Sequence, residues 1–307
     1  MKRILLFTFV IILIPFLIIG LNNKEKILYK IKYGSINNKV IKVKRVSSGE
    51  IEEIPLEEYV IGVVAGEMPA SFNMEALKSQ SVASRTYALK KAESTKKDYD
   101  VLDNTSNQVY LDYNDMKEKW KSSYEVNLNK VKQAVTSTKG EVILYNNDLI
   151  DAMFFSTSNG YTENSGDIFS NSLPYLVSVE SNWDKEESPV FSSLVSVTKT
   201  EFLFNLNLAS DNYIKVNNVE KTNTGRVKNI TINNKKFKSD EIKKAFNLKS
   251  TSFDISIEND NVIFNVNGYG HGVGMSQYGA NGMAKDGSNY KEILNHYYKN
   301  CEIKKIN

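Results

Sequence analysis

The hydropathy pattern begins with an uninterrupted apolar run near the N-terminus. Residues 4–21, ILLFTFVIILIPFLIIGL, are 18 positions without a charged side chain, and Lys2 and Arg3 precede them. As a helix this run is about 27 Å long, enough to cross the hydrocarbon core of a bilayer. The run is longer than the apolar part of a usual signal peptide, and no small-residue cleavage site follows it. We expect an uncleaved transmembrane anchor rather than a signal peptide, and either interpretation exports the remainder of the chain.

Helical and strand-like patterns alternate after this run. Apolar and polar residues alternate within the basic segment 23–50, which predicts short strands. A helix is predicted over 74–92, with Asn73 as its N-cap. A second, amphipathic helix is predicted over 117–138, and Gly140 is expected to end it.

Short elements make up the C-terminal half. A hairpin is predicted over 141–158, with its turn at Asn146, Asn147 and Asp148. Four further elements follow: a helix over 198–207, a hairpin over 227–239 turning at Asn233 and Asn234, a helix over 239–248 capped by Ser239 or Asp240, and a hairpin over 253–266. The glycine-rich segment 267–282 is expected to be a loop that leads into a last helix over 290–298. This mixture is typical of the α+β class.

Composition narrows the function classes. Of 307 residues, 41% are hydrophobic and 24% are charged, as in globular proteins. The net charge is +3, and the basic residues are mostly lysines spread along the chain, so we expect no nucleic-acid partner. Cys301 is the single cysteine, which excludes an internal disulfide and a cysteine-cluster metal site. The chain has two histidines, His271 and His296, which are too few for a typical multi-histidine metal site.

Glu67 is the first candidate for catalytic chemistry. It stands in VVAGEMPASF, where most of its neighbours are apolar. Desolvation disfavours a charged carboxylate, so this glutamate could keep its proton near neutral pH and act as a general acid on a glycosidic oxygen. The alternative is a structural glutamate beside a turn, which is the commoner outcome for such patterns.

Conventional glycoside hydrolysis requires a second carboxylate near the first. Asp103, Asp112 and Glu163 could supply it, but the sequence does not place them. A mechanism with one acid is also possible, provided that the sugar supplies its own nucleophile.

Four other residues are candidates for binding, and three of them also have a structural interpretation. Among the dense glycines of 268–282, His271 could face a ligand or cap a loop carbonyl. Arg85 could hold a lactyl carboxylate of a sugar or a structural partner. Gln108 and Tyr110, in TSNQVY, could line a polysaccharide cleft, and Tyr110 could equally belong to the core.

Four stretches together resemble one known family. They are IPLEEYVIGVVAGEMPASFNMEALKSQSVASRTYALKK, TSNQVY, FFSTSNGYTENSGDIFSNSLPYLVSV and GYGHGVGMSQYGANGMAKDG. In order and spacing they resemble the stage II sporulation protein D family, which is related to LytB-type amidase enhancers. The resemblance covers about residues 51–300.

The resemblance implies a lytic transglycosylase acting on peptidoglycan glycan strands, preferably strands stripped of stem peptides. Such an enzyme cleaves the bond between N-acetylmuramic acid and N-acetylglucosamine and leaves a 1,6-anhydro end. The family's catalytic acid corresponds to Glu67, which would protonate the leaving oxygen and then accept the proton of the muramic acid 6-hydroxyl. Five residues in matching motifs are assigned to substrate binding or site architecture: Arg85, Gln108, Tyr110, His271 and Gln277.

One departure from the family concerns metal binding. Some members carry a histidine and a cysteine pair after the hairpin and bind zinc there. Residues 154–175 of this chain have Ser156 and no histidine or cysteine. We therefore expect no zinc, and no other cofactor.

The resemblance also implies a setting in forespore engulfment. We expect a single-pass cell-membrane protein whose catalytic domain is extracytoplasmic, in the space between the mother-cell and forespore membranes. The implied partners are glycan strands, a sporulation amidase/endopeptidase and a membrane scaffold protein of the engulfment machinery. The alternative is a non-enzymatic glycan-binding activator of a cell-wall amidase. A third possibility, a structural member of a membrane complex, is based on the basic segment 23–50.

These expectations give a predicted organisation of the chain. An N-terminal transmembrane helix precedes a mixed α/β catalytic domain with a small β-rich subdomain. The predicted parts are a cytoplasmic tip and anchor (1–22), a basic juxtamembrane segment (23–50), a catalytic core (51–195), a β-rich subdomain (196–266), and a glycine-rich loop with a C-terminal helix returning to the core (267–307).

Overall fold

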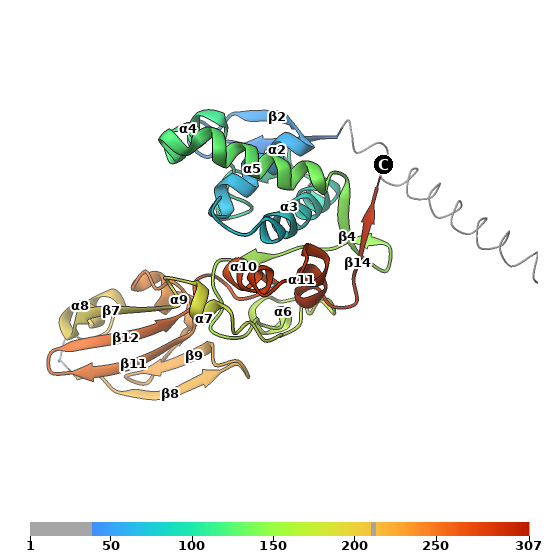
Figure 1. Ribbon diagram of the computed structural model, residues 1–307. Coiled ribbons are helices and arrows are strands. Elements are labelled where there is room, and N and C mark those ends of the chain that lie inside the picture. The colour runs from blue at the N-terminus through green and yellow to red at the C-terminus, as the bar shows by residue number, and fades with distance from the viewer. Residues whose placement is uncertain (1–38, 210–212, 307) are drawn as a thin grey trace, which may run out of the picture.

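The computed structural model describes residues 39–209 and 213–306. The predicted membrane anchor and most of the basic segment lie outside these residues. Within them, no helix is both long enough and apolar enough to span a bilayer. The described chain is a mixed α+β structure with several small sheets, as predicted, and it has a helical part and a β-rich part (Figure 1). The exact limits of the predicted domains stay predictions.

The helical part packs against a small sheet. Its helices are α2 (Leu56–Glu67), α3 (Met74–Ser94), α4 (Tyr113–Trp120) and α5 (Tyr124–Ser137), with a 3₁₀ turn, η2 (Lys121–Ser123), between the last two. The sheet has the order β2-β1-β3 and consists of β1 (Val40–Lys44), β2 (Ile51–Pro55) and β3 (Val101–Leu102). β1 is antiparallel to β2 and parallel to β3.

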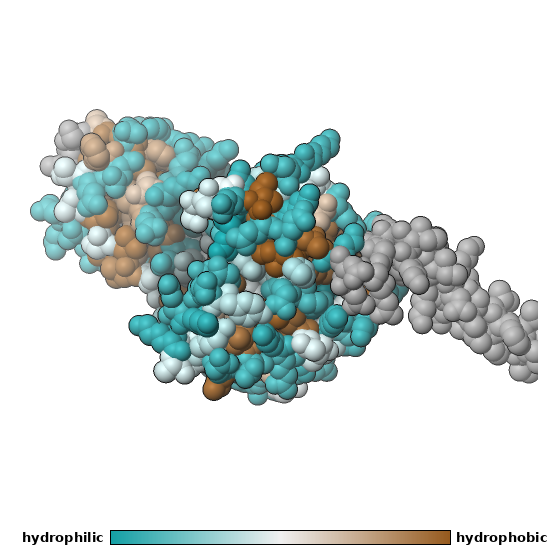
Figure 2. All heavy atoms as spheres, turned by 90° about the horizontal axis from the view of Figure 1, so that it is seen from above, coloured by the Kyte–Doolittle hydropathy of each residue, from teal (hydrophilic) through white to brown (hydrophobic). Residues whose placement is uncertain are grey.

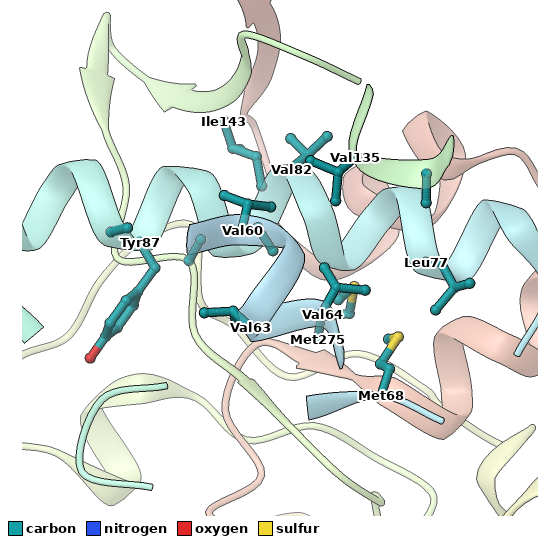
Figure 3. Packing of buried hydrophobic residues seen from close by; sticks show 14 of the residues in the cluster. Val60, Val63, Val64, Met68, Leu77, Val82, Tyr87, Val135, Ile143 and Met275 are labelled. Atoms are coloured by element: carbon teal, nitrogen blue, oxygen red, sulfur yellow. The ribbon is translucent and has the colours of Figure 1, made fainter. Parts of the chain in front are cut away.

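Helix α3 is the centre of the core. It contacts α2, α5, α10 and α11 as well as strand β4, so most of its circumference is buried. Figure 3 shows its Val82 among Val60 of α2, Val135 of α5 and Ile143 of β4. The predicted helix and its cap are confirmed, because the Asn73 side chain accepts a hydrogen bond from the Glu75 amide.

The second predicted helix is interrupted, so the prediction of one continuous helix over 117–138 was wrong. Asp112 accepts from the Asn114 and Asp115 amides and starts α4 four residues earlier than expected. Lys121 then ends α4 with a φ of 46°, in the left-handed region, before η2 leads into α5. Gly140 was expected to end this helix, but α5 ends at Ser137 with Thr138 as its C-cap, and Gly140 follows two residues later with a φ of 76°.

Asparagine pairs make the two predicted tight turns. Asn146 and Asn147 have φ values of 49° and 65°, and Asn233 and Asn234 have the same two values. Two positive values in succession define the hairpin turn that matches the twist of antiparallel strands. The first turn joins β4 (Glu141–Tyr145) to β5 (Asp148–Leu149), and β14 (Glu302–Lys305) pairs with the other edge of β4.

The β-rich part has its own apolar core. One sheet has the order β10-β9-β8, from β8 (Val216–Lys221), β9 (Val227–Ile232) and β10 (Lys235–Lys238). The other has the order β11-β12-β7, from β7 (Ser192–Thr198), β11 (Phe253–Glu258) and β12 (Asn261–Asn267). Strand β7 was not predicted. Helices α8 (Lys199–Asn205) and α9 (Ser239–Ala245) complete this part. Its core includes Phe202, Phe246 and Phe264 in mutual ring contact.

The predicted cap of α9 was wrong. Neither Ser239 nor Asp240 is the N-cap, because the helix begins at Ser239 and Lys238 precedes it as the cap residue. Glu241 accepts a hydrogen bond from the Lys238 amide, which is the reciprocal half of a capping box.

The glycine-rich segment is partly helical, which corrects the prediction of a loop throughout. Strand β13 (Met275–Ser276) pairs in parallel with β6 (Phe154–Phe155), and helix α10 (Gln277–Lys285) follows immediately. A Cβ at Gly279 would lie 2.2 Å from the Tyr297 hydroxyl, and one at Gly282 would lie 2.3 Å from the Trp183 Cβ. These glycines allow close packing of a helix rather than loop formation. The last helix, α11 (Tyr290–Tyr297), ends one residue before the predicted end.

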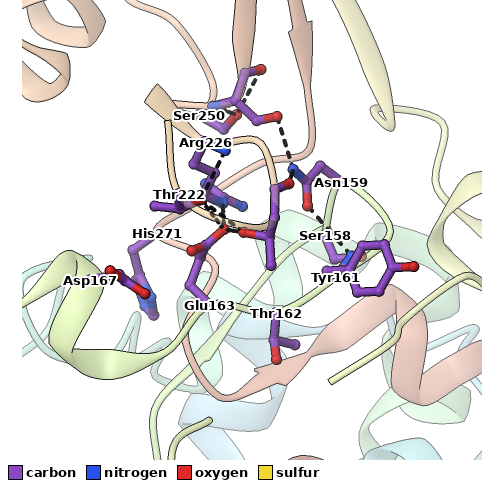
Figure 4. A network of polar contacts seen from close by, with 12 residues as sticks. Ser158, Asn159, Tyr161, Thr162, Glu163, Asp167, Thr222, Arg226, Ser250 and His271 are labelled. Carbon is purple, nitrogen blue, oxygen red and sulfur yellow. Dashed lines mark hydrogen bonds and ion pairs between the residues drawn. The ribbon is translucent and has the colours of Figure 1, made fainter. Parts of the chain in front are cut away.

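A buried polar network joins the β-rich part to the glycine-rich segment (Figure 4). Arg226 donates to the Gly270 carbonyl at 2.9 Å, and its Nε lies 3.5 Å from the Glu163 carboxylate. Thr222 and Thr224 also donate to Glu163. The short helices α6 (Ser165–Ile168) and α7 (Asp184–Glu187) lie in sequence between Glu163 and the β-rich part. The network fixes the path by which the chain returns from the β-rich part to α10.

The face of the molecule seen in Figure 2 is mostly polar on both parts. In the view of Figure 2, separate brown patches interrupt a predominantly teal surface. In the β-rich part the exposed large apolar side chains include Leu194, Phe204 and Ile257. Scattered apolar side chains of this kind are normal on soluble domains.

Candidate active site

Glu67 is the last residue of α2, and its partly exposed carboxyl group is held by two donors. The Val109 amide donates to its Oε1 at 2.6 Å, and the Gln277 side-chain amide lies 3.4 Å from its Oε2. One donor comes from the segment that follows β3, and the other from the first residue of α10. Three segments far apart in sequence therefore meet at this carboxyl group.

Two glycines on one face of α2 bring Val109 to Glu67. A Cβ at Gly66 would lie 2.3 Å from the Val109 carbonyl oxygen, and one at Gly62 would lie 2.2 Å from the Tyr110 ring. Residues four apart lie on the same face of a helix, so these two glycines leave space on α2 in which the backbone of residues 109–111 can pack closely. The Leu111 amide donates to the Gly62 carbonyl at 3.2 Å and holds the segment there.

Opposing effects act on the proton of Glu67. Burial raises the pKa of Glu67, while the bonds from Val109 and Gln277 and the positive charge of Lys119 lower it, and burial prevails. The C-terminal end of a helix carries partial negative charge, which also favours the neutral acid. A carboxylic acid that keeps its proton at higher pH than usual and is still reached by solvent is suited to general-acid catalysis.

Gln277 connects the glycine-rich segment to Glu67. Its side-chain amide also lies 3.5 Å from the Gln80 side-chain oxygen, and Gln80 donates to Ser84 at 3.0 Å along α3. Ser276, the N-cap of α10, donates in turn to the fully buried Asp184. The site therefore rests on the central helix and on a buried carboxylate network.

His271 lies in a different environment from Gln277. Its ring centroid is 5.7 Å from that of Phe155 and 5.8 Å from that of Phe169. Its Nδ1 accepts from the Val273 amide at 3.1 Å, so of the two predicted roles the contacts favour the structural one in the loop. Burial, with the nearby Arg226 cation, lowers the pKa of His271 to about 4, so the ring is neutral at physiological pH.

Gln108 and Tyr110 flank Val109 and pack against α2. Gln108 is fully buried and accepts from the Tyr59 hydroxyl at 2.9 Å. Tyr110 is partly exposed, stacks on Tyr59 with 5.5 Å between ring centroids, and lies under the Arg45 guanidinium. Gln108 thus holds the segment from within, while Tyr110 presents part of its ring to solvent near the site.

Arg85 is a structural residue in this arrangement. It is fully buried, and its guanidinium binds both carboxylate oxygens of Glu57 at 2.9 and 2.7 Å. It also donates to three carbonyl groups, those of Ser81, Val135 and Glu141. These contacts join α2, α3, α5 and β4. Because the guanidinium bonds to groups of the protein itself, its contacts do not support the predicted role in substrate binding.

The three carboxylates considered as a second catalytic group are each paired with an arginine. Asp103 and Asp112 lie 3.6 and 3.0 Å from Arg45. Glu163 is 1% exposed and is paired with Arg226. None of these three pairs involves Glu67.

Comparison with known proteins identifies the family. The family model described as SpoIID, Stage II sporulation protein, matches residues 44–145. The chain is 42% identical over 269 residues to stage II sporulation protein D of Bacillus subtilis, covering 86% of this chain and 78% of that protein. The chain belongs to the stage II sporulation protein D family. It is therefore a sporulation protein of this type, and the resemblance that its motifs suggested is confirmed.

Other relatives support the same assignment. Stage II sporulation protein D of Bacillus amyloliquefaciens is 40% identical over 269 residues, with 86% of this chain and 78% of that protein covered. The amidase enhancer of Bacillus subtilis is 31% identical over 291 residues, with 77% of this chain but 39% of that protein covered. The family model spans α2 to α5 and so includes Glu67, Arg85, Gln108 and Tyr110, while His271 and Gln277 lie outside it.

The zinc site found in some family members does not fit this chain. Residues 154–175 contain no histidine or cysteine. Among residues 39–209 and 213–306, no group of three or more histidine, cysteine, aspartate or glutamate side chains is arranged to hold a metal ion.

Sequence reasoning missed two side chains at the site. Lys119 of α4 donates to the Ala65 and Gly66 carbonyls at the end of α2, at 2.8 and 3.4 Å. Gln80 of α3 supports Gln277. The lysine contacts backbone carbonyls of a distant segment, so no motif marks it. Gln80 is fully buried, and a polar residue on the apolar face of a helix is the signal that could have found it.

Proposed function

We propose that this protein is a lytic transglycosylase of peptidoglycan glycan strands, in which Glu67 acts first as acid and then as base. In the first step the Glu67 carboxyl proton passes to the glycosidic oxygen as the bond from C1 of N-acetylmuramic acid to that oxygen breaks. In the second step the 6-hydroxyl oxygen of the same sugar bonds to C1, and its proton passes to the Glu67 carboxylate. The products are a 1,6-anhydro end and a new free 4-hydroxyl, and the acid is regenerated.

The observation that carries the proposal is the raised pKa of the partly exposed Glu67 carboxyl group. Glu67 has the properties of the acid, and the three other candidates are engaged with Arg45 or Arg226. A mechanism in which the sugar supplies the nucleophile needs no second carboxylate. The Val109 and Gln277 donors would stabilise the carboxylate that exists between the two proton transfers.

The substrate preference and the setting are part of the same proposal. We propose strands stripped of stem peptides as the preferred substrate, and forespore engulfment as the process. The chain would be anchored by residues 4–21 with its catalytic part in the space between the two membranes. A sporulation amidase/endopeptidase would supply the stripped strands, and a membrane scaffold protein would hold the machinery together.

A second function is favoured by one comparison. The chain is 31% identical to a protein named amidase enhancer, so a non-enzymatic role that binds glycan and activates a cell-wall amidase is the alternative. In that role the proton of Glu67 would have no function.

The test uses the full-length protein in detergent and its Glu67→Gln variant, which keeps the size and shape of the side chain. Each is incubated with intact and with amidase-stripped glycan strands, and the products are analysed by mass spectrometry. Anhydro-ended fragments from the wild type alone are the expected result. Strand binding without fragments from either protein would contradict the proposal and favour the amidase activator.

A further inference from the structure

Lys119 is placed to act on Glu67 from outside α2. It belongs to α4, and its ammonium group reaches the Ala65 and Gly66 carbonyls, 2.8 and 3.4 Å away. The carbonyls of the last helical turn have no intrahelical partner and carry the negative end of the helix dipole. Within α2 the last turn contains no basic residue, so the cation at this end comes from a different helix.

We propose that Lys119 tunes Glu67 for its two roles, by holding a positive charge on the helix end that carries the carboxyl group. The inference rests on the proposed function, because it concerns the acid and base steps assigned to Glu67. A group that must give up a proton and then take one back works best when neither form is strongly preferred. Burial and the helix end favour the neutral acid, and Lys119 offsets them in favour of the carboxylate.

The neighbours of Glu67 single out this lysine. Four groups of the described residues interact with the Glu67 carboxyl: the Val109 amide and Gln277 of α10 by hydrogen bonds, and Lys119 of α4 and the Tyr59 hydroxyl of α2 electrostatically. Burial raises the pKa of Tyr59 well above its usual value, so this hydroxyl is neutral. Of these four groups, Lys119 alone carries a charge near neutral pH. The influence is mutual: burial lowers the pKa of Lys119, and the negative charge of Glu67 raises it.

Lys130 of α5 provides a matched control. Its ammonium group donates to the Phe72 carbonyl at 2.6 Å, so it makes the same kind of bond to the loop that follows Glu67. Burial lowers its pKa as well. Replacing Lys130 by glutamine removes one positive charge and one lysine-to-carbonyl bond without touching the end of α2.

The experiment compares pH profiles of full-length wild type, Lys119→Gln, Lys119→Arg and Lys130→Gln. The readout is kcat/KM for release of anhydro ends from stripped strands. Because the free enzyme needs protonated Glu67, activity falls as pH rises through its pKa. We expect Lys119→Gln to move this alkaline limb upward by about half to one pH unit and to lower the maximal rate several-fold. Lys119→Arg should restore the wild-type limb, and Lys130→Gln should leave it in place.

A second readout separates this inference from the proposed function. The carboxyl carbon of Glu67, labelled with carbon-13 and assigned by its loss in Glu67→Gln, is titrated by NMR in each variant. A raised Glu67 pKa in Lys119→Gln but not in Lys130→Gln supports the inference even if no glycan is cleaved. Equal Glu67 titrations in wild type and Lys119→Gln, or equal shifts in both glutamine variants, would overturn it, and Lys119 would then be a structural helix cap.

Discussion

Glu67 and Glu163 both have pKa values raised by burial, but they lie in different surroundings. Glu67 is partly exposed at a helix end, and its carboxyl group is held by the Val109 amide and Gln277. Glu163 is 1% exposed, has a pKa raised to about 7, and faces Arg226 and two threonine hydroxyls. The comparison teaches that a raised pKa alone does not mark an active site: the carboxyl group must also be open to substrate and free of an arginine partner.

The same contrast holds for the charges beside them. Lys119 binds carbonyl groups of the helix that carries Glu67 and leaves its carboxyl group available. Arg226 lies against Glu163 and is itself fully buried, and burial lowers its pKa to about 10. Gly272 permits this packing, because a Cβ there would lie 2.6 Å from the Arg226 Nε. In the proposed mechanism the Glu67 arrangement serves catalysis, whereas the Glu163 arrangement joins two parts of the molecule.

The largest expected effect tests the first half of the comparison. Replacing Glu67 by glutamine should lower the rate of anhydro-end formation by about 10²–10⁴-fold, because the general acid is removed. Thermal unfolding and strand binding should be close to those of the wild type. Glu163→Gln is the matched control, and it should still cleave glycan. An active Glu67→Gln protein would break the comparison.

The next effect concerns the stability of the buried pair. Arg226→Met should lower the free energy of unfolding by about 3–5 kcal/mol at pH 8, because a buried carboxylate loses its cation. The bond to the Gly270 carbonyl is lost as well. Urea unfolding followed by circular dichroism measures this change. Adding Glu163→Gln to this variant should recover part of the loss, and a double variant less stable than Arg226→Met would argue against the pair.

A pH series sharpens the role of Glu163. The pKa of Glu163 in the folded protein, about 7, lies above its ordinary value of 4.5, so the folded protein holds this proton while the unfolded chain releases it. Between about pH 4.5 and 7 the wild type should therefore lose stability relative to Glu163→Gln as pH rises. The lowered pKa of His271 acts in the opposite direction, but it is common to both proteins and cancels in their difference. A difference in unfolding free energy that does not vary with pH would contradict the assigned shift.

The smallest effect tests how backbone packing positions Glu67. Gly66→Ala places a methyl group 2.3 Å from the Val109 carbonyl oxygen, so the segment must move away from α2. We expect a loss of about 1–3 kcal/mol in stability, as for other overpacked sites, with reduced activity at temperatures where the protein stays folded. Chemical denaturation and initial rates measure the two changes. Unchanged activity would mean that the Val109 bond does not hold the acid.

The parts of the fold that follow from local chemistry could be predicted from the sequence. Asn73 caps α3, and the pairs Asn146–Asn147 and Asn233–Asn234 make tight turns, because each depends on a few adjacent residues. Helix α10 was missed because glycines are poor helix formers, and their purpose here is contact with Tyr297 and Trp183, which are far away in sequence.

In the candidate site, too, some residues could be predicted from local sequence and others only from tertiary contacts. Glu67 could be proposed from its apolar neighbours, and Gln277 from its motif. Two ion pairs could not be predicted, because they depend on tertiary contacts: Arg85 with Glu57, and Glu163 with Arg226. The bond from Lys119 to the end of α2 has no local signal either. Sequence motifs therefore pointed to Glu67 and Gln277, but not to Lys119 or to the arginine partners of the other carboxylates.

The most direct test of the central claim is the fate of solvent oxygen. Glycan strands are digested by the full-length protein in water labelled with oxygen-18, and the new ends are examined by mass spectrometry. If Glu67 works alone with the sugar's own 6-hydroxyl, the new muramic acid ends are anhydro sugars that carry no label. Reducing ends that carry the label at C1 would show that water is the nucleophile and would contradict the single-carboxyl mechanism.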